Sequence, residues 1–243
     1  PPTSIYVFGN ATWMNPDKTN ASYVNSTYVV VASNPIIEII EEGVNKTTPH
    51  DKTTDVSNIT IYSSGNDRVR NIRIYHAGGN FDYDCYDCTL QIIPDYYGDL
   101  YAGGNFTSNI IVTIPKGKAP GIYWTYIVVN STNGGHDTYL MNLSVPMNTS
   151  WSLTPTSFPT ILAQPNTSGW IGDVNVTNDG NVKIYFETSK RGSASPLILV
   201  VPEGLAVDTL STNNISIFYS VSASYPQGLY YGEVAVRNST LPA

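Results

Sequence analysis

The sequence is poor in charged residues, and in basic residues most of all. Only 12 lysines and arginines stand against 19 aspartates and glutamates in 243 residues, giving a formal net charge of −7. Nucleic-acid binding needs a dense basic surface, which this composition does not supply. No apolar run reaches the roughly 18 residues of a membrane span. There is no initial methionine and no signal-peptide pattern, which indicates a processed chain or a portion of a longer one.

Catalytic motifs are also absent. The sequence has no Gly-rich phosphate loop, no Gly-X-Ser-X-Gly elbow and no His-Glu-X-X-His. Its three histidines all lie near Gly, Pro or Asp in expected loops. Glu38, Glu41 and Glu42 cluster where a predicted strand ends, and paired carboxylates can cleave glycosides. A solvated strand end explains them more simply, so we expect no enzyme and no cofactor.

Cysteine is limited to Cys85 and Cys88. The pair could form half of a zinc site with His76 and His136, or a redox centre. No second cysteine pair, thioredoxin-like pattern or following histidine supports those alternatives. We expect a structural disulfide in an oxidising location, contributing about 2 kcal/mol because the loop is short.

An acidic insertion surrounds the cysteines. Asp82, Asp84 and Asp87 are weak candidates for a calcium site, since calcium takes several oxygen ligands. The spacing lacks the glycine and the final glutamate of an EF-hand loop. The sequence therefore favours a solvated acidic loop without a metal.

Asn-X-Ser/Thr sequons are the most unusual feature that is present. They occur at 13 of the 23 asparagines, about three times the frequency expected from the 48 serines and threonines. Such sequons indicate a secreted, surface-exposed chain that carries N-glycans. They lie at Asn10, Asn20, Asn25, Asn45, Asn58, Asn105, Asn130, Asn142, Asn148, Asn166, Asn175, Asn214 and Asn238.

Several sequons fall inside predicted strands. In Asn58-Ile59-Thr60, strand alternation places Asn and Thr on the solvent face and Ile59 in the core. Sequons beginning at Asn105, Asn175 and Asn214 have the same form. We expect glycans on the sheet faces as well as on the loops.

An internal repeat predicts the fold. Residues 121–129 and 228–237 read as the same strand, offset by 107 residues. Residues 59–62, 71–75 and 110–114 recur, in the same order, as 174–177, 183–186 and 217–221. No helical period is comparably strong. We predict an all-β chain with two tandem Ig-like β-sandwich domains at residues 26–147 and 148–243, the first opened by residues 28–31 and 36–40.

The two copies differ at their ends. After the first copy the chain turns at Asn133 and runs back through residues 138–145, and no such strand follows the second. The second domain is therefore predicted to lack its last strand and to expose unpaired backbone groups. Its predicted acceptor edge consists of Tyr230, Gly232, Val234 and Val236.

The N-terminal extension, residues 1–25, belongs to neither repeat. It contains a short apolar strand with no evident local partner, which we interpret as a strand donated to another copy. This candidate donor strand consists of Ser4, Ile5, Tyr6, Val7 and Phe8.

These features carry a family resemblance. The Asn-Asp-Gly-Asn pattern at residues 178–181, the strand at 215–221 and the stretches 226–236 and 114–123 resemble Ig-like modules of archaeal surface proteins. With the sequons and the N-terminal strand, the chain resembles subunits of archaeal extracellular filaments of the thread or bundling-pilus kind. That resemblance implies an extracellular, cell-surface homopolymer joined head to tail by donor-strand complementation. The N-terminal apolar helix of type IV pilins is absent.

Two other interpretations remain open. The chain could be an S-layer or adhesin module, with carbohydrate stacking on Trp13, Trp124, Trp151 or Trp170. It could also be an accessory domain of a secreted hydrolase. Strands favour aromatic residues for packing alone, so the tryptophans do not decide between these interpretations.

Overall fold

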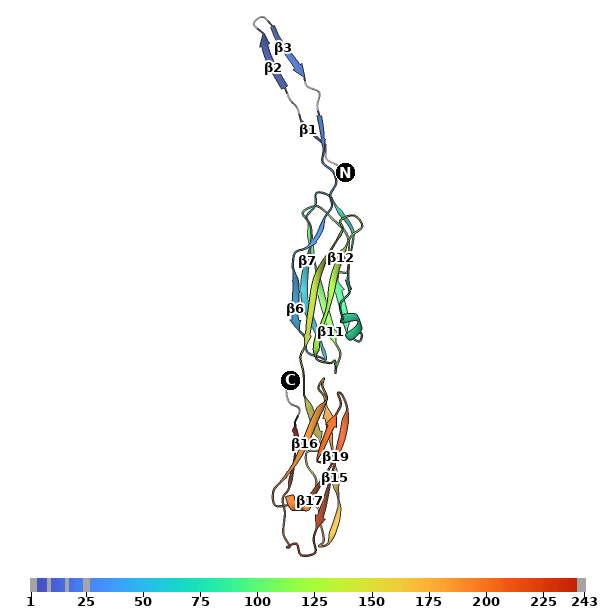
Figure 1. The fold of residues 1–243 in the computed structure, drawn as a ribbon, viewed down its shortest axis with the longest axis vertical. Helices are drawn as coiled ribbons and strands as arrows, with labels where there is room; N and C mark the ends of the chain where they lie inside the picture. Colours follow the sequence, from blue (N-terminus) through green and yellow to red (C-terminus); the bar gives the residue numbers. More distant parts are fainter. Residues whose placement is uncertain (1–3, 8–9, 16–17, 24–26, 240–243) are drawn as a thin grey trace.

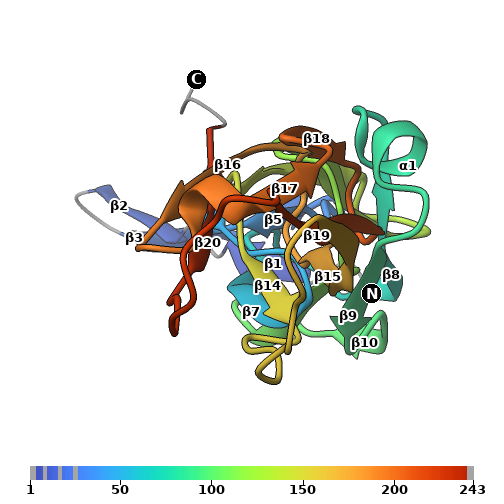
Figure 2. The same cartoon turned by 90° about the horizontal axis from the view of Figure 1, so that it is seen from below.

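The computed structural model describes residues 4–7, 10–15, 18–23 and 27–239. The predicted all-β fold with Ig-like β-sandwiches is confirmed. Two sandwiches lie end to end, and a β-ribbon projects from the far end of the first (Figure 1). Along the long axis the two sandwiches overlap (Figure 2), so the described chain is a rod. No described helix is long and apolar enough to cross a membrane.

The first sandwich packs a five-stranded sheet against a four-stranded sheet. The larger sheet has the order β10 (Tyr96–Leu100), β8 (Val69–Ala77), β12 (Gly121–Asn130), β13 (His136–Val145), β6 (Gly43–Thr47). The smaller has the order β5 (Ile37–Ile39), β7 (Lys52–Ser63), β11 (Asn105–Ile114), β9 (Thr89–Ile93). A short helix, α1 (Phe81–Asp84), lies in the acidic insertion.

The second sandwich repeats this plan with fewer strands. One sheet has the order β14 (Trp151–Thr154), β15 (Thr167–Asn178), β19 (Thr212–Val221), β17 (Ile198–Val201). The other has only β18 (Gly204–Val207), β16 (Ile184–Arg191) and β20 (Glu233–Asn238). A single 3₁₀ turn, η1 (Ser195–Leu197), precedes β17.

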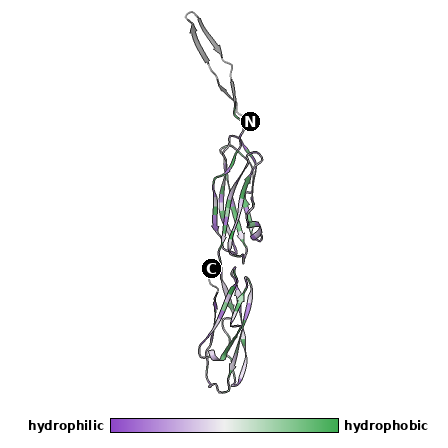
Figure 3. Ribbon diagram, viewed as in Figure 1, coloured by the Kyte–Doolittle hydropathy of each residue, from purple (hydrophilic) through white to green (hydrophobic). Residues whose placement is uncertain are grey.

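Strand alternation builds both cores (Figure 3). On β13, Tyr139, Met141, Leu143 and Val145 point inward and are at most 2% exposed, while the residues between them face outward. The core of the first sandwich contains 20 buried residues and that of the second contains eight, including Val176 and Ile215. The second sandwich therefore encloses much less apolar surface.

The N-terminal residues form a ribbon of paired strands, which we call the arm. β1 (Ser4–Val7) pairs antiparallel with β4 (Thr27–Val30), and β2 (Asn10–Asn15) pairs antiparallel with β3 (Lys18–Tyr23). Two predictions are corrected here. The N-terminal strand does have a local partner, and residues 28–30 lie in the arm instead of opening the first sandwich. The ladder between β1 and β4 satisfies backbone groups that a lone strand would leave unpaired.

Candidate strand-acceptor site

The open edge of the second sandwich is the candidate site. β20 pairs with β16 on one side, and no strand within the described residues pairs with it on the other. In the first sandwich the corresponding strand, β12, is followed in the sheet by β13 and then by β6. Within the described residues, this sheet of the second sandwich therefore has three strands where the corresponding sheet of the first has five.

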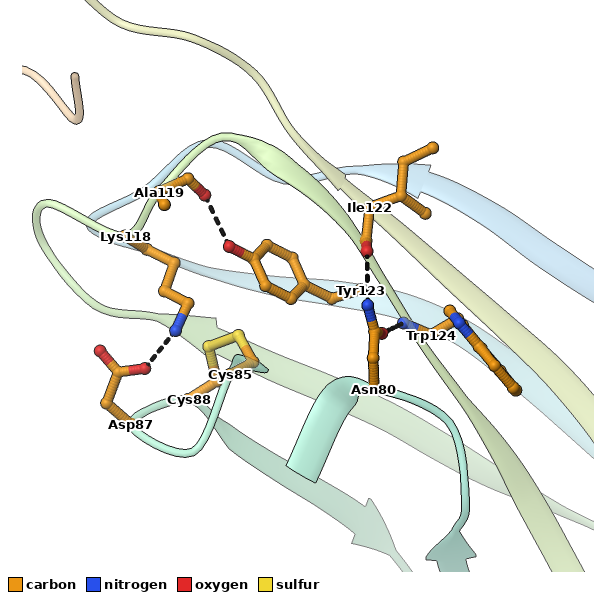
Figure 4. The surroundings of a disulfide bond; sticks show 9 residues. All are labelled: Asn80, Cys85, Asp87, Cys88, Lys118, Ala119, Ile122, Tyr123 and Trp124. Carbon is orange, nitrogen blue, oxygen red and sulfur yellow. Dashed lines mark hydrogen bonds and ion pairs between the residues drawn. A yellow bond between two sulfur atoms is a disulfide. The ribbon is translucent and has the colours of Figure 1, made fainter. Parts of the chain in front are cut away.

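A repeated tyrosine contact fixes the correspondence between the two edges. The Tyr123 hydroxyl donates to the Ala119 carbonyl oxygen at 2.7 Å (Figure 4), and the Tyr230 hydroxyl donates to the Pro226 carbonyl oxygen at 2.8 Å. Each bond spans four residues, as in the tyrosine corner of Ig-like domains. The offset of 107 residues read from the sequence therefore also holds in space.

The start of β12 depends on β13 for its strand pairing. Residues 126–130 of β12 pair with both β8 and β13, whereas residues 121–125 pair with β13 alone. On their other edge, the Asn80 side chain bonds the Trp124 N–H at 2.8 Å and the Ile122 carbonyl oxygen at 3.0 Å (Figure 4). Without β13, this half of the strand would lack its backbone partners.

Within the described residues, no strand takes the place of β13 in the second sandwich, and the corresponding half-strand has no ladder partner. Residues 229–232 have no strand pairing, and β20 begins only at Glu233. The predicted strand over residues 228–237 is thus wrong in its first half. On one edge of this segment, the Tyr231 N–H donates to Ser193 Oγ at 3.0 Å and the Tyr231 carbonyl oxygen accepts from the Ala194 N–H at 2.8 Å. On the other edge, no strand within the described residues supplies backbone partners.

Two of the four predicted acceptor residues lie in β20, and the other two lie in the segment before it. Val234 and Val236 contact the second core but are only partly buried, whereas their counterparts Ile127 and Val129 are 0% exposed. Tyr230 and Gly232 lie in the irregular half. The neighbouring side chains of Leu229 and Tyr231 are 90% and 70% exposed. An uncovered sheet edge thus stands beside exposed apolar side chains.

Of the candidate donor residues, Ser4, Ile5, Tyr6 and Val7 form β1, and Phe8 lies outside the described residues. The structure does not bring them to the acceptor edge of their own chain. The arm and the second sandwich lie at opposite ends of the rod (Figure 1).

Cys85 and Cys88 are joined by a disulfide. The three calcium candidates do not converge on one point. Asp82 Oδ1 lies 3.2 Å from His76 Nδ1, and Asp87 Oδ1 lies 2.6 Å from Lys118 Nζ (Figure 4).

The one cluster of three metal-type ligands among the described residues is Cys85, Asp87 and Cys88. Its two sulfur atoms are consumed by the disulfide, which leaves Asp87 as a ligand already paired with Lys118.

The sequon asparagines lie mainly on outward faces. Asn45, Asn58, Asn105, Asn130, Asn166, Asn175 and Asn214 are exposed, while Asn142, Asn148 and Asn238 are half-buried. Asn10 and Asn20 lie in β2 and β3, and Asn25 lies outside the described residues. The middle residues of the in-strand sequons point inward as expected, with Ile59, Val176 and Ile215 at 0% exposure.

No family model matches this chain, and no curated protein matches it. Among solved structures, the CsuC–CsuE chaperone–tip adhesion subunit complex of Acinetobacter baumannii has a TM-score of 0.40 at 10% identity, covering 83% of this chain and 99% of that chain. The SafA pilin of Salmonella enterica in complex with the SafB chaperone has a TM-score of 0.35 at 8% identity, covering 84% and 99%. The CupB2 chaperone of Pseudomonas aeruginosa has a TM-score of 0.34 at 10% identity, covering 81% and 98%. Identities and TM-scores this low do not bear on the function of this chain.

Proposed function

We propose that this chain is the structural subunit of an extracellular filament, in which the arm of one copy completes the second sandwich of the next. The observation that carries the proposal is that residues 229–232 have no strand partner within the described part of the chain. Its counterpart in the first sandwich is a strand because β13 pairs with it. A strand donated by another copy would supply the same backbone hydrogen bonds.

The arrangement of the chain supports a polymer. The arm projects from one end of the rod and the open sandwich forms the other end (Figure 1). A contact between two different surfaces of identical chains is head-to-tail, and such contacts generate open filaments unless the rotation closes a ring. The partner is therefore a second copy of the same chain.

The sequons support a cell-surface location. Seven sequon asparagines are exposed, and several project from the outward faces of the sheets. N-glycans there would leave the inward face of the open edge free for the incoming strand. We propose a glycosylated, non-enzymatic filament protein of the archaeal thread or bundling-pilus kind that the sequence resembles.

Removal of the arm tests the proposal. A chain that begins at Ala32 keeps both sandwiches and should remain monomeric at concentrations where the full chain forms filaments. Its second sandwich should become more stable when a peptide of residues 4–31 is added, by about 2.7 kcal/mol when the free peptide is at 100 times its dissociation constant.

The stability of the first sandwich should not respond to the peptide, which makes it an internal control. Filaments of normal repeat from the shortened chain would refute the proposal.

A second candidate function is carbohydrate binding by a surface adhesin or S-layer module. The Trp170 side chain is 59% exposed, and its indole N–H donates to Asp173 Oδ1 at 3.2 Å, which fixes the orientation of the ring. A fixed, exposed indole next to a carboxylate is suited to stacking on a sugar. Loss of glycan-array binding in Trp170→Ala, with unchanged assembly, would support this role.

A further inference from the structure

The two sandwiches hold their incoming chain in the same way. In the second, the Asn181 side chain accepts from the Asn148 N–H at 2.7 Å and donates to the Pro146 carbonyl oxygen at 2.9 Å. In the first, the Asn66 side chain accepts from the Asn34 N–H at 2.7 Å and donates to the Ala32 carbonyl oxygen at 2.9 Å. The corresponding backbone bonds, from the N–H of Asn66 and of Asn181, are both 3.0 Å long. We call each arrangement an entry clamp.

The glycine before each clamp asparagine confirms that the backbone paths agree. A Cβ on Gly65 would lie 2.1 Å from the Asn34 carbonyl oxygen, and one on Gly180 would lie 2.2 Å from the Asn148 carbonyl oxygen. Asn34 and Asn148 are 114 residues apart (148 − 34), and Gly65 and Gly180 are 115 apart (180 − 65). The entry clamp is therefore part of the repeat.

The two clamps differ in the strand that precedes them. The chain reaches the second clamp directly from β13, the strand that closes the preceding sandwich, which ends at Val145. The chain reaches the first clamp from β4 of the arm, which ends at Val30. At the clamp offset of 114 residues, Val31 corresponds to Val145 and Val30 to Ser144.

From this correspondence we infer that β4 is the strand donated to the next copy, in the place that β13 takes in the first sandwich. It follows that β4 lies beside residues 228–232 of the acceptor copy. β1 remains paired with β4 and takes the outer position that β6 holds in the first sandwich. The three-stranded sheet gains two strands and reaches the five of the first, with β1 antiparallel to β4 where β6 is parallel to β13. This inference rests on the proposed function and names its donor strand.

The entry clamp of the second sandwich is covered by the first sandwich, whereas the entry clamp of the first sandwich is exposed. Asn181 is 3% exposed because the first sandwich lies against its clamp, with His50 Nε2 2.9 Å from Asn148 Nδ2 and Lys116 Nζ 3.3 Å from Asp179 Oδ1. Asn66 is exposed in the isolated chain. In the assembled filament, the second sandwich of the acceptor copy would cover Asn66 of the donor copy in the same way.

The register of β13 gives the contacts of the donated strand. Val145 lies opposite Gly121 and is 2% exposed, and Ser144 lies opposite Ile122 and faces outward. By the two offsets, Val31 lies opposite Gly228 of the acceptor with its side chain inward. Val30 lies opposite Leu229 with its side chain outward.

These two adjacent valines form a matched test. Both are outside the cores of the isolated chain, with Val31 40% and Val30 63% exposed, so neither change should alter the fold of the monomer. Val31→Asp would bury a carboxylate in the acceptor, so the critical concentration for assembly should rise about tenfold or more. Val30→Asp should leave the critical concentration within about twofold, because an outward carboxylate stays hydrated. Sedimentation and electron microscopy measure both.

A cross-link provides an independent measurement. Val30→Cys in one copy and Leu229→Cys in another should form an intermolecular disulfide in filaments, since the corresponding pair, Ser144 and Ile122, are direct cross-strand partners. Ile5→Cys combined with Leu229→Cys should not cross-link, because β1 is one strand further away.

The outcomes separate this inference from the proposed function. Normal assembly of Val31→Asp, or cross-linking from position 5 instead of position 30, refutes β4 as the donor even when removal of the arm abolishes filaments. Filaments without the arm refute the proposed function itself.

Discussion

The two entry clamps allow one contact to be measured in two environments. Asn181→Ala removes two side-chain hydrogen bonds from a group that is 3% exposed. Asn66→Ala removes bonds of the same lengths from an exposed group. We expect the first change to destabilise the second sandwich much more than the second change destabilises the first.

The magnitudes follow from solvent access. Each buried polar group left without a partner costs about 1–3 kcal/mol, so the loss of both bonds in Asn181→Ala should cost about 2–6 kcal/mol. At the exposed clamp, water replaces the lost bonds, and a net hydrogen bond is worth about 0.5–1.5 kcal/mol. Asn66→Ala should therefore cost about 1–3 kcal/mol in the monomer.

Native-state hydrogen exchange measures the stability of each sandwich separately. The slowest amides of β15 report the second sandwich and those of β7 the first, in a chain that begins at Ala32 and remains monomeric. Each 1.4 kcal/mol changes protection about tenfold, so Asn181→Ala should accelerate exchange in β15 by about 30-fold or more. The unchanged sandwich of each variant is its control.

Filaments extend the same comparison. If Asn66 becomes buried on assembly, Asn66→Ala in the full chain should accelerate exchange in β7 of the filament as much as Asn181→Ala does in β15. Equal costs for the two variants in the monomer would show that burial at the clamp is not what sets their contribution. If Asn66→Ala leaves the exchange of β7 in the filament as slow as it is without the substitution, the first clamp is not buried on assembly.

Three further predictions concern covalent groups and pH. Alkylation of denatured, unreduced protein should label neither Cys85 nor Cys88, and two free thiols would refute the disulfide. Glycopeptide mapping should find most of the 13 sequons occupied and Asn148 the least modified, because the entry clamp and His50 hold it; occupancy of fewer than half would weaken the surface role. Burial, with nearby carboxylates, raises the pKa of Tyr123 above its ordinary value of about 10. The Tyr123 hydroxyl therefore loses its proton at a lower pH in the unfolded chain than in the folded chain. Its contribution to stability is fully present below about pH 10 and is lost as the pH rises through the folded pKa. Tyr123→Phe should make urea unfolding less sensitive to pH in that range.

Much of the fold is readable from local pattern alone. Alternation of apolar and polar residues identifies β11, β12, β13 and β19, because each has one face in the core and one in water. The same alternation places Ile59, within its sequon, inside the core. The repeat is also visible, since Tyr123 and Tyr230 occupy the same position in the two copies of the repeated sequence.

Other elements depend on partners distant in the sequence. The pairing of β1 with β4 spans the arm and is not recorded in the composition of either strand, so the N-terminal strand was predicted to be alone. The acidic loop offers three carboxylates in sequence, and their distances to Lys118 and His76 were set only by packing.

The sequence by itself determined the strand pattern, the duplication and the sequon positions, because side-chain periodicity and covalent chemistry are local properties. It also encodes an extended strand over residues 228–232. Tertiary structure alone decided that this segment has no strand partner within the described residues, since a β-ladder exists only where a neighbour accepts and donates backbone hydrogen bonds. The agreement of the two entry clamps, which names β4 as the donor, likewise arises from backbone geometry between segments more than 30 residues apart.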